Sequence, residues 1–205
     1  ILHDFKNPFS IISLGAHIIN QRHGGDPKTA KICASIESQI RRMVDMANDL
    51  TAFARGDGEI ERAQLSMEQL FKHFKELNQP FFGDTTVTVE MYPNNVQLEG
   101  DLSKLLRVLQ NLVANAIEAI HQSQKPGKIV ISAIDKGNTI HLRIADNGPG
   151  IPEEIQSRFF EPFITFGKRG GTGLGTAIVR SIIDAHHGNI IFSTSASGTT
   201  FTIQI

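Results

Sequence analysis

The chain has 205 residues, 40% of them apolar and 20% charged, so it can bury a sizeable core and is not intrinsically disordered. Lys and Arg number 20 against 21 Asp and Glu, and the net charge of -1 argues against the broad basic surface of a nucleic-acid-binding protein. The lone Cys33 excludes an internal disulfide and, since no signal peptide is visible, indicates a reducing compartment, the cytoplasm.

No part of the sequence predicts a membrane span. The uncharged run 7–21 is too short to cross a bilayer and is interrupted by Pro8, Gly15 and His17. We therefore expect no membrane contact by this chain. It begins at Ile1, without Met and inside a predicted helix, so we interpret it as a fragment of a longer protein, with the cytoplasmic part of a membrane-anchored receptor left open as one origin.

The first expected domain, residues 1–57, is an antiparallel helical hairpin. Apolar residues recur there at alternating spacings of three and four, which is typical of long helices in a coiled-coil-like bundle. Asp26 suits the N-cap of the second helix and Pro27 its first position. Because two helices alone bury little, we expect a homodimer through residues 1–55 that forms a four-helix bundle. The two apolar runs are Leu2, Phe5, Phe9, Ile12, Ala16 and Ile19, then Ile36, Ile40, Met43, Ala47, Leu50 and Ala54.

After the Gly-containing linker 55–59, residues 58–205 alternate helices and strands, which predicts an α/β (α+β) sandwich. The expected helices are 68–77, 101–119 with Asp101 as N-cap, and 174–188; the expected strands are 87–91, 129–134, 139–145, 190–193 and 200–205.

Two segments of this second domain have side chains suited to a nucleotide and its metal. Asn111 and Asn115 share one helix face, and their amide oxygens suit a hard cation such as Mg²⁺ that bridges phosphates. Asp146 ends a predicted strand before Gly148 and Gly150, so its carboxylate can accept from an exocyclic amine while the glycines let a flat ring approach. Taken alone, each has a simpler interpretation, namely two solvated amides and a tight turn.

Two further segments, Phe160–Phe163 and Gly171–Gly175, flank a stretch whose only charges are Lys168 and Arg169. The glycines of the second segment precede a helix, and amides at a helix N-terminus attract phosphate. The pattern is neither a Walker A loop nor a dinucleotide motif. A Gly-rich segment beside a mobile lid is the alternative, and a lid still implies a ligand.

Near the chain start, His3 lies beside the apolar seam of the first helix, where a neutral imidazole is a good nucleophile. The adjacent Asp4 can orient the ring or accept its proton, and Asn7 follows one turn later on the same face. Pro8 should bend or loosen the helix here. The alternative is an exposed histidine without a function.

Together, in this order, these segments resemble the boxes of bacterial two-component sensor histidine kinases over almost the whole chain. His3-Asp4-x-x-Asn7-Pro8 resembles the phospho-acceptor box. The other matches are Asn111–Ala116 to the N box, Asp146–Gly150 to the G1 box, Phe160–Phe163 to the F box and Gly171–Gly175 to the G2 box. The resemblance implies a dimerisation and phosphotransfer hairpin followed by a Bergerat-type ATP-binding domain.

The resemblance also implies roles for single residues. His3 matches the phospho-acceptor, Asp4 its general base, and Asn7 the residue that helps to place water when the partner is dephosphorylated. Asn115 matches the Mg²⁺ ligand, Asn111 lies close to metal and phosphates, and Asp146 matches the adenine-binding carboxylate. The remaining expected ATP-binding residues are Gly148, Gly150, Lys168, Arg169, Gly171, Thr172, Gly173, Leu174 and Gly175.

The implied activity is ATP-dependent autophosphorylation of His3, followed by transfer to an Asp of a response-regulator receiver domain. Related ATPases have Glu where Asn111 stands, and an amide cannot act as the base that activates water, which disfavours a chaperone- or topoisomerase-like ATPase. The competing hypothesis is a pseudokinase-like dimer that docks a receiver or another kinase. Glu118 and Ala119 depart from the basic and aromatic residues common in the family.

Overall fold

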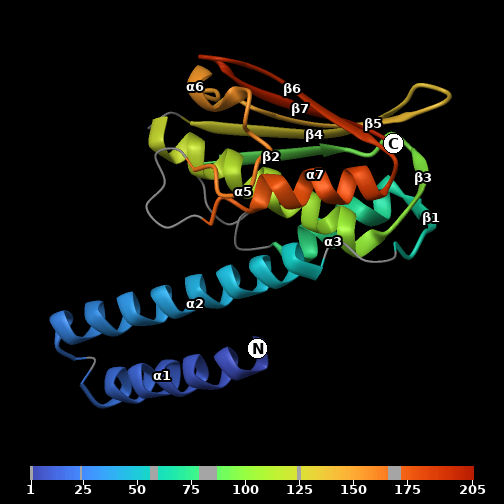
Figure 1. Cartoon of the computed structure of the whole chain (residues 1–205). Coiled ribbons are helices and arrows are strands. Elements are labelled where there is room, and N and C mark those ends of the chain that lie inside the picture. The colour runs from blue at the N-terminus through green and yellow to red at the C-terminus, as the bar shows by residue number, and fades with distance from the viewer. Residues whose placement is uncertain (1, 24, 56–59, 79–86, 124–125, 166–171) are drawn as a thin grey trace. The chain divides into compact units, whose positions relative to one another are not determined.

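Two long helices, α1 (Leu2–His23) and α2 (Pro27–Arg55), form the first part of the chain in this computed structural model (Figure 1). The structure describes residues 2–23, 25–55, 60–78, 87–123, 126–165 and 172–205. One compact unit contains Ile1–Gly56, and a second contains Asp57–Phe166 with Gly173–Ile205. Each unit is described separately below.

In the first unit, α1 and α2 pack against each other, and Ala16, Cys33 and Ile40 are buried. Asp26 caps α2 as expected, because its carboxylate accepts from the Thr29 N–H at 3.0 Å. Within one chain, only some of the described residues of the heptad seams are buried. The seam residues that stay exposed are Ile12, Ile19, Ile36, Met43 and Leu50.

The second unit is built on a five-stranded sheet with the strand order β2-β4-β5-β7-β6. Strand β2 pairs with β4 in parallel, and the remaining neighbours are antiparallel. A separate antiparallel pair joins β1 to β3. The strands are β1 (Ala63–Ser66), β2 (Val87–Tyr92), β3 (Gln97–Gly100), β4 (Gly127–Asp135), β5 (Ile140–Asp146), β6 (Asn189–Ser195) and β7 (Gly198–Gln204).

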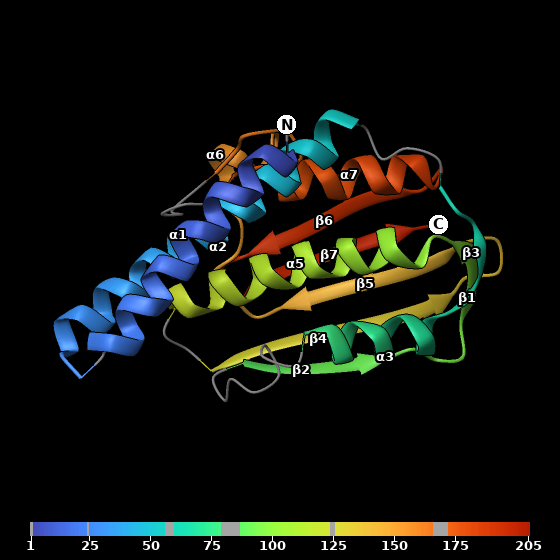
Figure 2. The same cartoon turned by 90° about the horizontal axis from the view of Figure 1, so that it is seen from below.

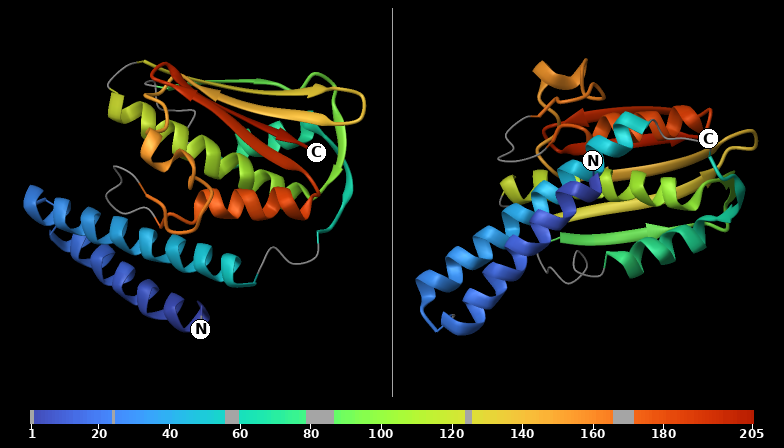
Figure 3. Two further views of the ribbon diagram at one scale, coloured as in Figure 1. Left: turned by 45° about the horizontal axis from the view of Figure 1, so that its top comes forward. Right: turned by 60° about the horizontal axis from the view of Figure 1, so that its bottom comes forward.

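Three helices cover one face of this sheet: α3 (Met67–Leu77), α5 (Leu102–Ser123) and α7 (Gly175–Ala185) (Figure 2). Helices α5 and α7 run side by side (Figure 3). A short helix, α6 (Glu153–Gln156), follows β5. The arrangement confirms the predicted α/β sandwich of the second part of the chain.

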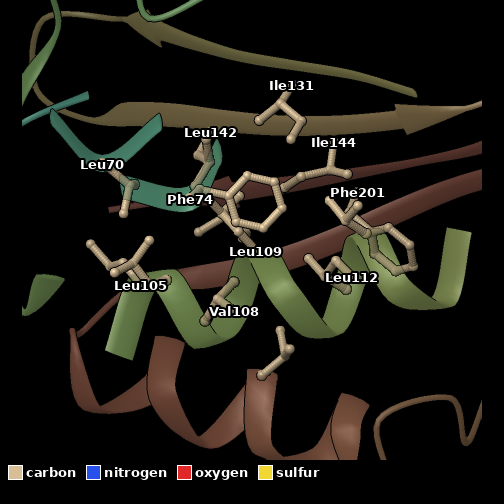
Figure 4. Close-up of a cluster of buried hydrophobic side chains, with 14 of the residues drawn as sticks. Leu70, Phe74, Leu105, Val108, Leu109, Leu112, Ile131, Leu142, Ile144 and Phe201 are labelled. Carbon is tan, nitrogen blue, oxygen red and sulfur yellow. The ribbon is translucent and has the colours of Figure 1, made fainter. Parts of the chain in front are cut away.

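The core lies between the sheet and these helices. Alternate residues of β4 and β5, such as Ile131 and Ile144, are buried toward α5, as the period of two in a strand requires (Figure 4). Leu109 and Leu112 of α5 are fully buried against them, and Phe74 joins the same cluster from α3. Burial of each such side chain contributes about 1.5–3 kcal/mol, so α5 is held firmly in place.

Asp101 caps α5 as predicted, since its Oδ1 accepts from the Ser103 and Lys104 N–H groups at 2.9 and 3.1 Å. Helix α7 stops at Ala185, so the prediction that it ends at Gly188 is wrong. The residue with left-handed backbone is His187, at φ 59°. Strands β1 and β3 and helix α6 were not expected at all.

Candidate functional site

The carboxylate of Asp146 stands at the end of β5, next to the turn 147–151. Its Oδ1 accepts from the Gly148 N–H at 2.8 Å and from the Thr199 N–H at 3.4 Å. Partial burial raises the pKa of Asp146 above its ordinary 3.8, and the two backbone donors partly oppose that rise. The result is a half-buried acceptor held in one orientation.

The turn after Asp146 is attached to the sheet on both sides. Asn147 accepts from the Lys128 N–H at 2.7 Å, which ties the turn to the start of β4. The Ile151 N–H donates to Thr194 Oγ1 of β6 at 2.8 Å. Gly150 lies in the left-handed region at φ 84°, and a Cβ there would overlap the Ser195 carbonyl oxygen. The turn therefore requires glycine at position 150.

Helix α5 forms the neighbouring wall. A Cβ added at Gly148 would lie 2.9 Å from Asp146 Oδ1 and 3.6 Å from the Ala119 Cβ, so the turn backbone lies close to this helix. Asn115 is half-buried one helical turn before Ala119 on the same face. The fold thus brings Asp146, Gly148 and Asn115 to the same region.

Asn111 faces the beginning of α7. Its Nδ2 donates to the Arg107 carbonyl at 2.9 Å, and a Cβ added at Gly175 would lie 2.8 Å from its Oδ1. The amide oxygen therefore points to the N-terminus of α7, where backbone N–H groups leave a partial positive charge. Leu174, the N-cap of α7, is buried.

Phe163 and Gly173, on either side of residues 164–172, lie next to each other. The Phe163 N–H donates to the Gly173 carbonyl at 2.9 Å, and both residues have left-handed backbone, at φ 66° and 67°. A Cβ at Gly173 would lie 2.6 Å from the Phe163 carbonyl carbon, so glycine is required there. Phe159 and Phe160 pack against each other and against Phe192, whereas Phe163 is 64% exposed.

Some predicted site residues fall outside the described part of the chain. Lys168, Arg169 and Gly171 are among them, while the neighbouring Thr172 is described and half-buried. His3, Asp4 and Asn7 lie in the first two turns of α1, but their side chains are not among those described.

Sequence reasoning missed the contribution of the β6–β7 hairpin. Thr199, which is 5% exposed, supplies a backbone donor to Asp146, and Thr194 holds Ile151. Gln156 of α6 donates to the Ile151 carbonyl at 2.7 Å. The contacts from Thr194 and Thr199 span 43 and 53 residues, so no local spacing could have revealed them.

The oxygen atoms of this site suit a cation that is shared between the protein and a nucleotide better than a metal held by protein alone. Within the described ranges, no group of three or more His, Cys, Asp or Glu side chains could hold a metal ion. Asn111 and Asn115 offer neutral amide oxygens, which suit a cation whose other ligands are phosphate oxygens and water.

Comparisons with known proteins agree with this geometry. Residues 100–205 match the family model described as histidine kinase-, DNA gyrase B-, and HSP90-like ATPase. The catalytic domain of histidine kinase ThkA matches with a TM-score of 0.61 and 32% identity, over 71% of this chain and 95% of the ThkA chain. This chain belongs to the sensor histidine kinase family.

The curated relatives of this sensor histidine kinase chain extend the match to its helical part. The probable sensor histidine kinase TcrY of Mycobacterium tuberculosis is 34% identical over 99% of the chain and 44% of TcrY. The sensory histidine kinase/phosphatase NtrB of Azospirillum brasilense is 30% identical over 99% of the chain and 53% of NtrB. The chain thus spans about half the length of these relatives.

A solved structure of ThkA in complex with the response regulator protein TrrA matches 99% of the chain and 58% of the ThkA chain, with a TM-score of 0.70 and 27% identity. The second unit of the present chain therefore has the Bergerat-type α/β fold of the matched ATPase family. None of the helices in the described residues is long and apolar enough to cross a membrane.

Proposed function

We propose that this chain is the core of a protein-histidine kinase, which autophosphorylates on His3 with Mg-ATP and passes the phosphoryl group to an Asp of a response-regulator receiver domain. The observation that carries the proposal is the half-buried Asp146 carboxylate, held by Gly148 and Thr199 beside the α5 face that carries Asn115. Family membership supports it, since the matched model is that of ATPases.

In this proposal, each element of the site holds one part of the nucleotide. Asp146 accepts from the exocyclic amine of adenine, while Gly148 and Gly150 let the ring approach the backbone. Asn115 would be the protein ligand of Mg²⁺, and Asn111 would lie on the phosphate side of it; bound Mg²⁺ would neutralise charge on the phosphates. The phosphates lie at the N-terminus of α7. The remaining residues that we propose to bind ATP are Lys168, Arg169, Gly171, Thr172, Gly173, Leu174 and Gly175.

His3 is the nucleophile of the proposed reaction. Its ring nitrogen forms a bond to the γ-phosphorus as the bond to the bridging oxygen breaks, ADP leaves, and Asp4 accepts the imidazole proton. Asn111 cannot activate water as a base, because its side-chain amide does not take up a proton as a carboxylate does. The site therefore favours transfer to a positioned imidazole over hydrolysis, with positioning as the main source of catalysis.

The domain division that we propose assigns dimerisation and phosphotransfer to residues 1–57 and ATP binding to residues 58–205. The homodimer forms through residues 1–55 as a four-helix bundle, in the cytoplasm. The receiver partner is supported by the ThkA complex with a response regulator.

NtrB is named as both kinase and phosphatase, which supports a second role for Asn7 in dephosphorylating the receiver. An Asn7→Ala variant that dephosphorylates the receiver normally would exclude that role.

Incubation of the purified chain with γ-labelled ATP tests the proposal. We expect acid-labile, base-stable label on the wild type, and at least about a hundredfold less on His3→Gln, because the nucleophile is lost. Asn115→Ala and Asp146→Ala should also abolish labelling, whereas His17→Gln, which alters an exposed histidine later in α1, should leave it intact.

Label that persists on His3→Gln would exclude His3 as the acceptor. A wild type that stays unlabelled, yet binds a receiver equally well with and without Asn115→Ala, would favour the pseudokinase-like docking module. Steady ATP turnover without a partner would instead indicate a chaperone- or topoisomerase-like ATPase.

A further inference from the structure

A chain of hydroxyl and amide groups links the turn after β5 to the β6–β7 hairpin. Thr194 Oγ1 accepts from the Ile151 N–H at 2.8 Å and lies 3.0 Å from Thr199 Oγ1. Thr199 donates its backbone N–H to Asp146 Oδ1 at 3.4 Å. Both ends of the turn, at Asp146 and at Ile151, are therefore attached to the same pair of strands.

The position of the Thr194 hydroxyl is fixed by the sheet. Thr194 and Thr199 are direct partners in the antiparallel register of β6 and β7. Thr199 is 5% exposed, and a Cβ at Gly150 would lie 3.0 Å from Thr194 Oγ1, so the turn lies in close contact with this pair. Such a hydroxyl can hold the turn without rearrangement when a ligand arrives.

We infer that Thr194 is a positioning residue for recognition of the adenine amino group, acting through Ile151 and Thr199 on the orientation of the Asp146 carboxylate. The inference rests on the proposed function, in which Asp146 accepts from that amine. Thr194 itself does not touch the nucleotide.

Removal of the Thr194 hydroxyl should weaken binding of the base. Without Thr194 Oγ1, the Ile151 N–H and the Thr199 hydroxyl both lose a partner, and a lost hydrogen bond of this kind is costly where water cannot replace it. Among the described residues, Gln156 still holds the far end of the turn through its hydrogen bond to the Ile151 carbonyl. Because the hydrogen bonds of Thr194 run to Ile151 in the turn and to Thr199 on β7, the loss should fall on the base and not on the phosphates.

Calorimetric titration with two nucleotides separates these contributions. ADP carries the 6-amino group, purine riboside 5′-diphosphate lacks it, and neither has a γ-phosphate to transfer. In Thr194→Val we expect ADP affinity to fall by about fivefold to tenfold, while affinity for the analogue changes by less than about twofold. Thr194→Ser keeps the hydroxyl and should remain within about twofold of the wild type for both ligands.

The matched control is Thr202→Val on the same hairpin, where a half-buried threonine pairs with Ile191. It should bind both nucleotides as the wild type does. Thermal unfolding without nucleotide is recorded for every variant, and Thr194→Cys replaces Thr194→Val if the latter does not fold.

Equal weakening of both nucleotides in Thr194→Val, unchanged ADP binding, or failure of Thr194→Ser to restore it would each overturn the inference. Asp146→Asn distinguishes this failure from failure of the proposed function. If Asp146→Asn binds ADP no better than the analogue and Thr194→Val behaves as the wild type, only the role of Thr194 is wrong. If Asp146→Asn still prefers ADP as the wild type does, adenine recognition by Asp146 is itself wrong.

Discussion

The half-buried carboxylate of Asp146 links nucleotide binding to pH. Burial raises its pKa above the ordinary 3.8, against the opposing effect of the Gly148 and Thr199 donors. In the absence of nucleotide, a raised folded-state pKa gives a stability contribution that is present below the unfolded pKa and lost as pH rises through the folded pKa. Nucleotide binding has the opposite sign, because only the ionised carboxylate is a strong acceptor for the adenine amine.

We therefore expect ADP affinity to fall on acidification, starting at a pH above the range in which an ordinary aspartate titrates near 3.8. The size of the fall is about tenfold to a hundredfold, the usual contribution of one hydrogen bond to a charged group. Calorimetric titration across this range measures it. Purine riboside 5′-diphosphate shares the phosphate titration of ADP, so its curve isolates the contribution of Asp146. If the difference between the affinities for ADP and for purine riboside 5′-diphosphate depends on acid in Asp146→Asn as it does in the wild type, this explanation is wrong.

Single residues differ in how far the sequence reveals them. Asp146 with Gly148 and Gly150 forms a local pattern, and the predicted strand end and turn are where the structure has them. Thr194 and Thr199 are ordinary strand threonines in the sequence. Their relation to Asp146 depends on the pairing of β7 with both β5 and β6, which the sequence pattern does not specify.

At the level of elements, His186 joins the ends of the two helices that carry Asn111 and Gly175. The ring is 4% exposed, its Nδ1–H donates to the Ile182 carbonyl at 2.8 Å, and its Nε2 accepts from the Asp101 N–H at 3.1 Å. This pattern requires the neutral ring with the proton on Nδ1.

His186→Asn tests this link. Asn can keep the bond to the carbonyl four residues earlier, as Asn78 does with Phe74 at 2.8 Å, but it is too short to reach Asp101. We expect a loss of about 1–2 kcal/mol in the free energy of unfolding, because the buried Asp101 N–H loses its acceptor. Urea denaturation measures it.

The matched control is His187→Asn, at an exposed neighbour whose φ of 59° suits asparagine, and it should stay within about 0.5 kcal/mol of the wild type. Equal losses in the two variants would show that the Asp101 bond contributes nothing specific.

Long, strongly periodic elements were predictable, and short ones were not. Helices α3 and α5 have an apolar face that matches a period of 3.6, so their existence followed from the pattern. Strands β1 and β3 have four residues each and no apolar alternation that stands out from a loop. They form because each pairs with the other, a contact that becomes visible only in the folded chain.

For the molecule as a whole, the apolar surface is concentrated on the first two helices. Among the described residues, ten of the fourteen exposed large apolar side chains lie on α1 and α2. Two helices that leave so much apolar surface in water are poorly stabilised, since each buried isoleucine contributes about 1.5–3 kcal/mol. This distribution supports the proposed dimer through residues 1–55.

Sedimentation equilibrium of the purified chain should therefore give twice the 22.5 kDa of one polypeptide. Ile12→Asp should shift the population to monomer, because a two-fold axis places the new charge twice within the apolar contact. Ile191→Asp is its matched control: the same residue type is 50% exposed on β6, against 51% for Ile12, and this variant should remain dimeric. A monomeric wild type would contradict the proposed dimer. Dimers that tolerate Ile12→Asp while Ile191→Asp disrupts them would place the self-association surface elsewhere.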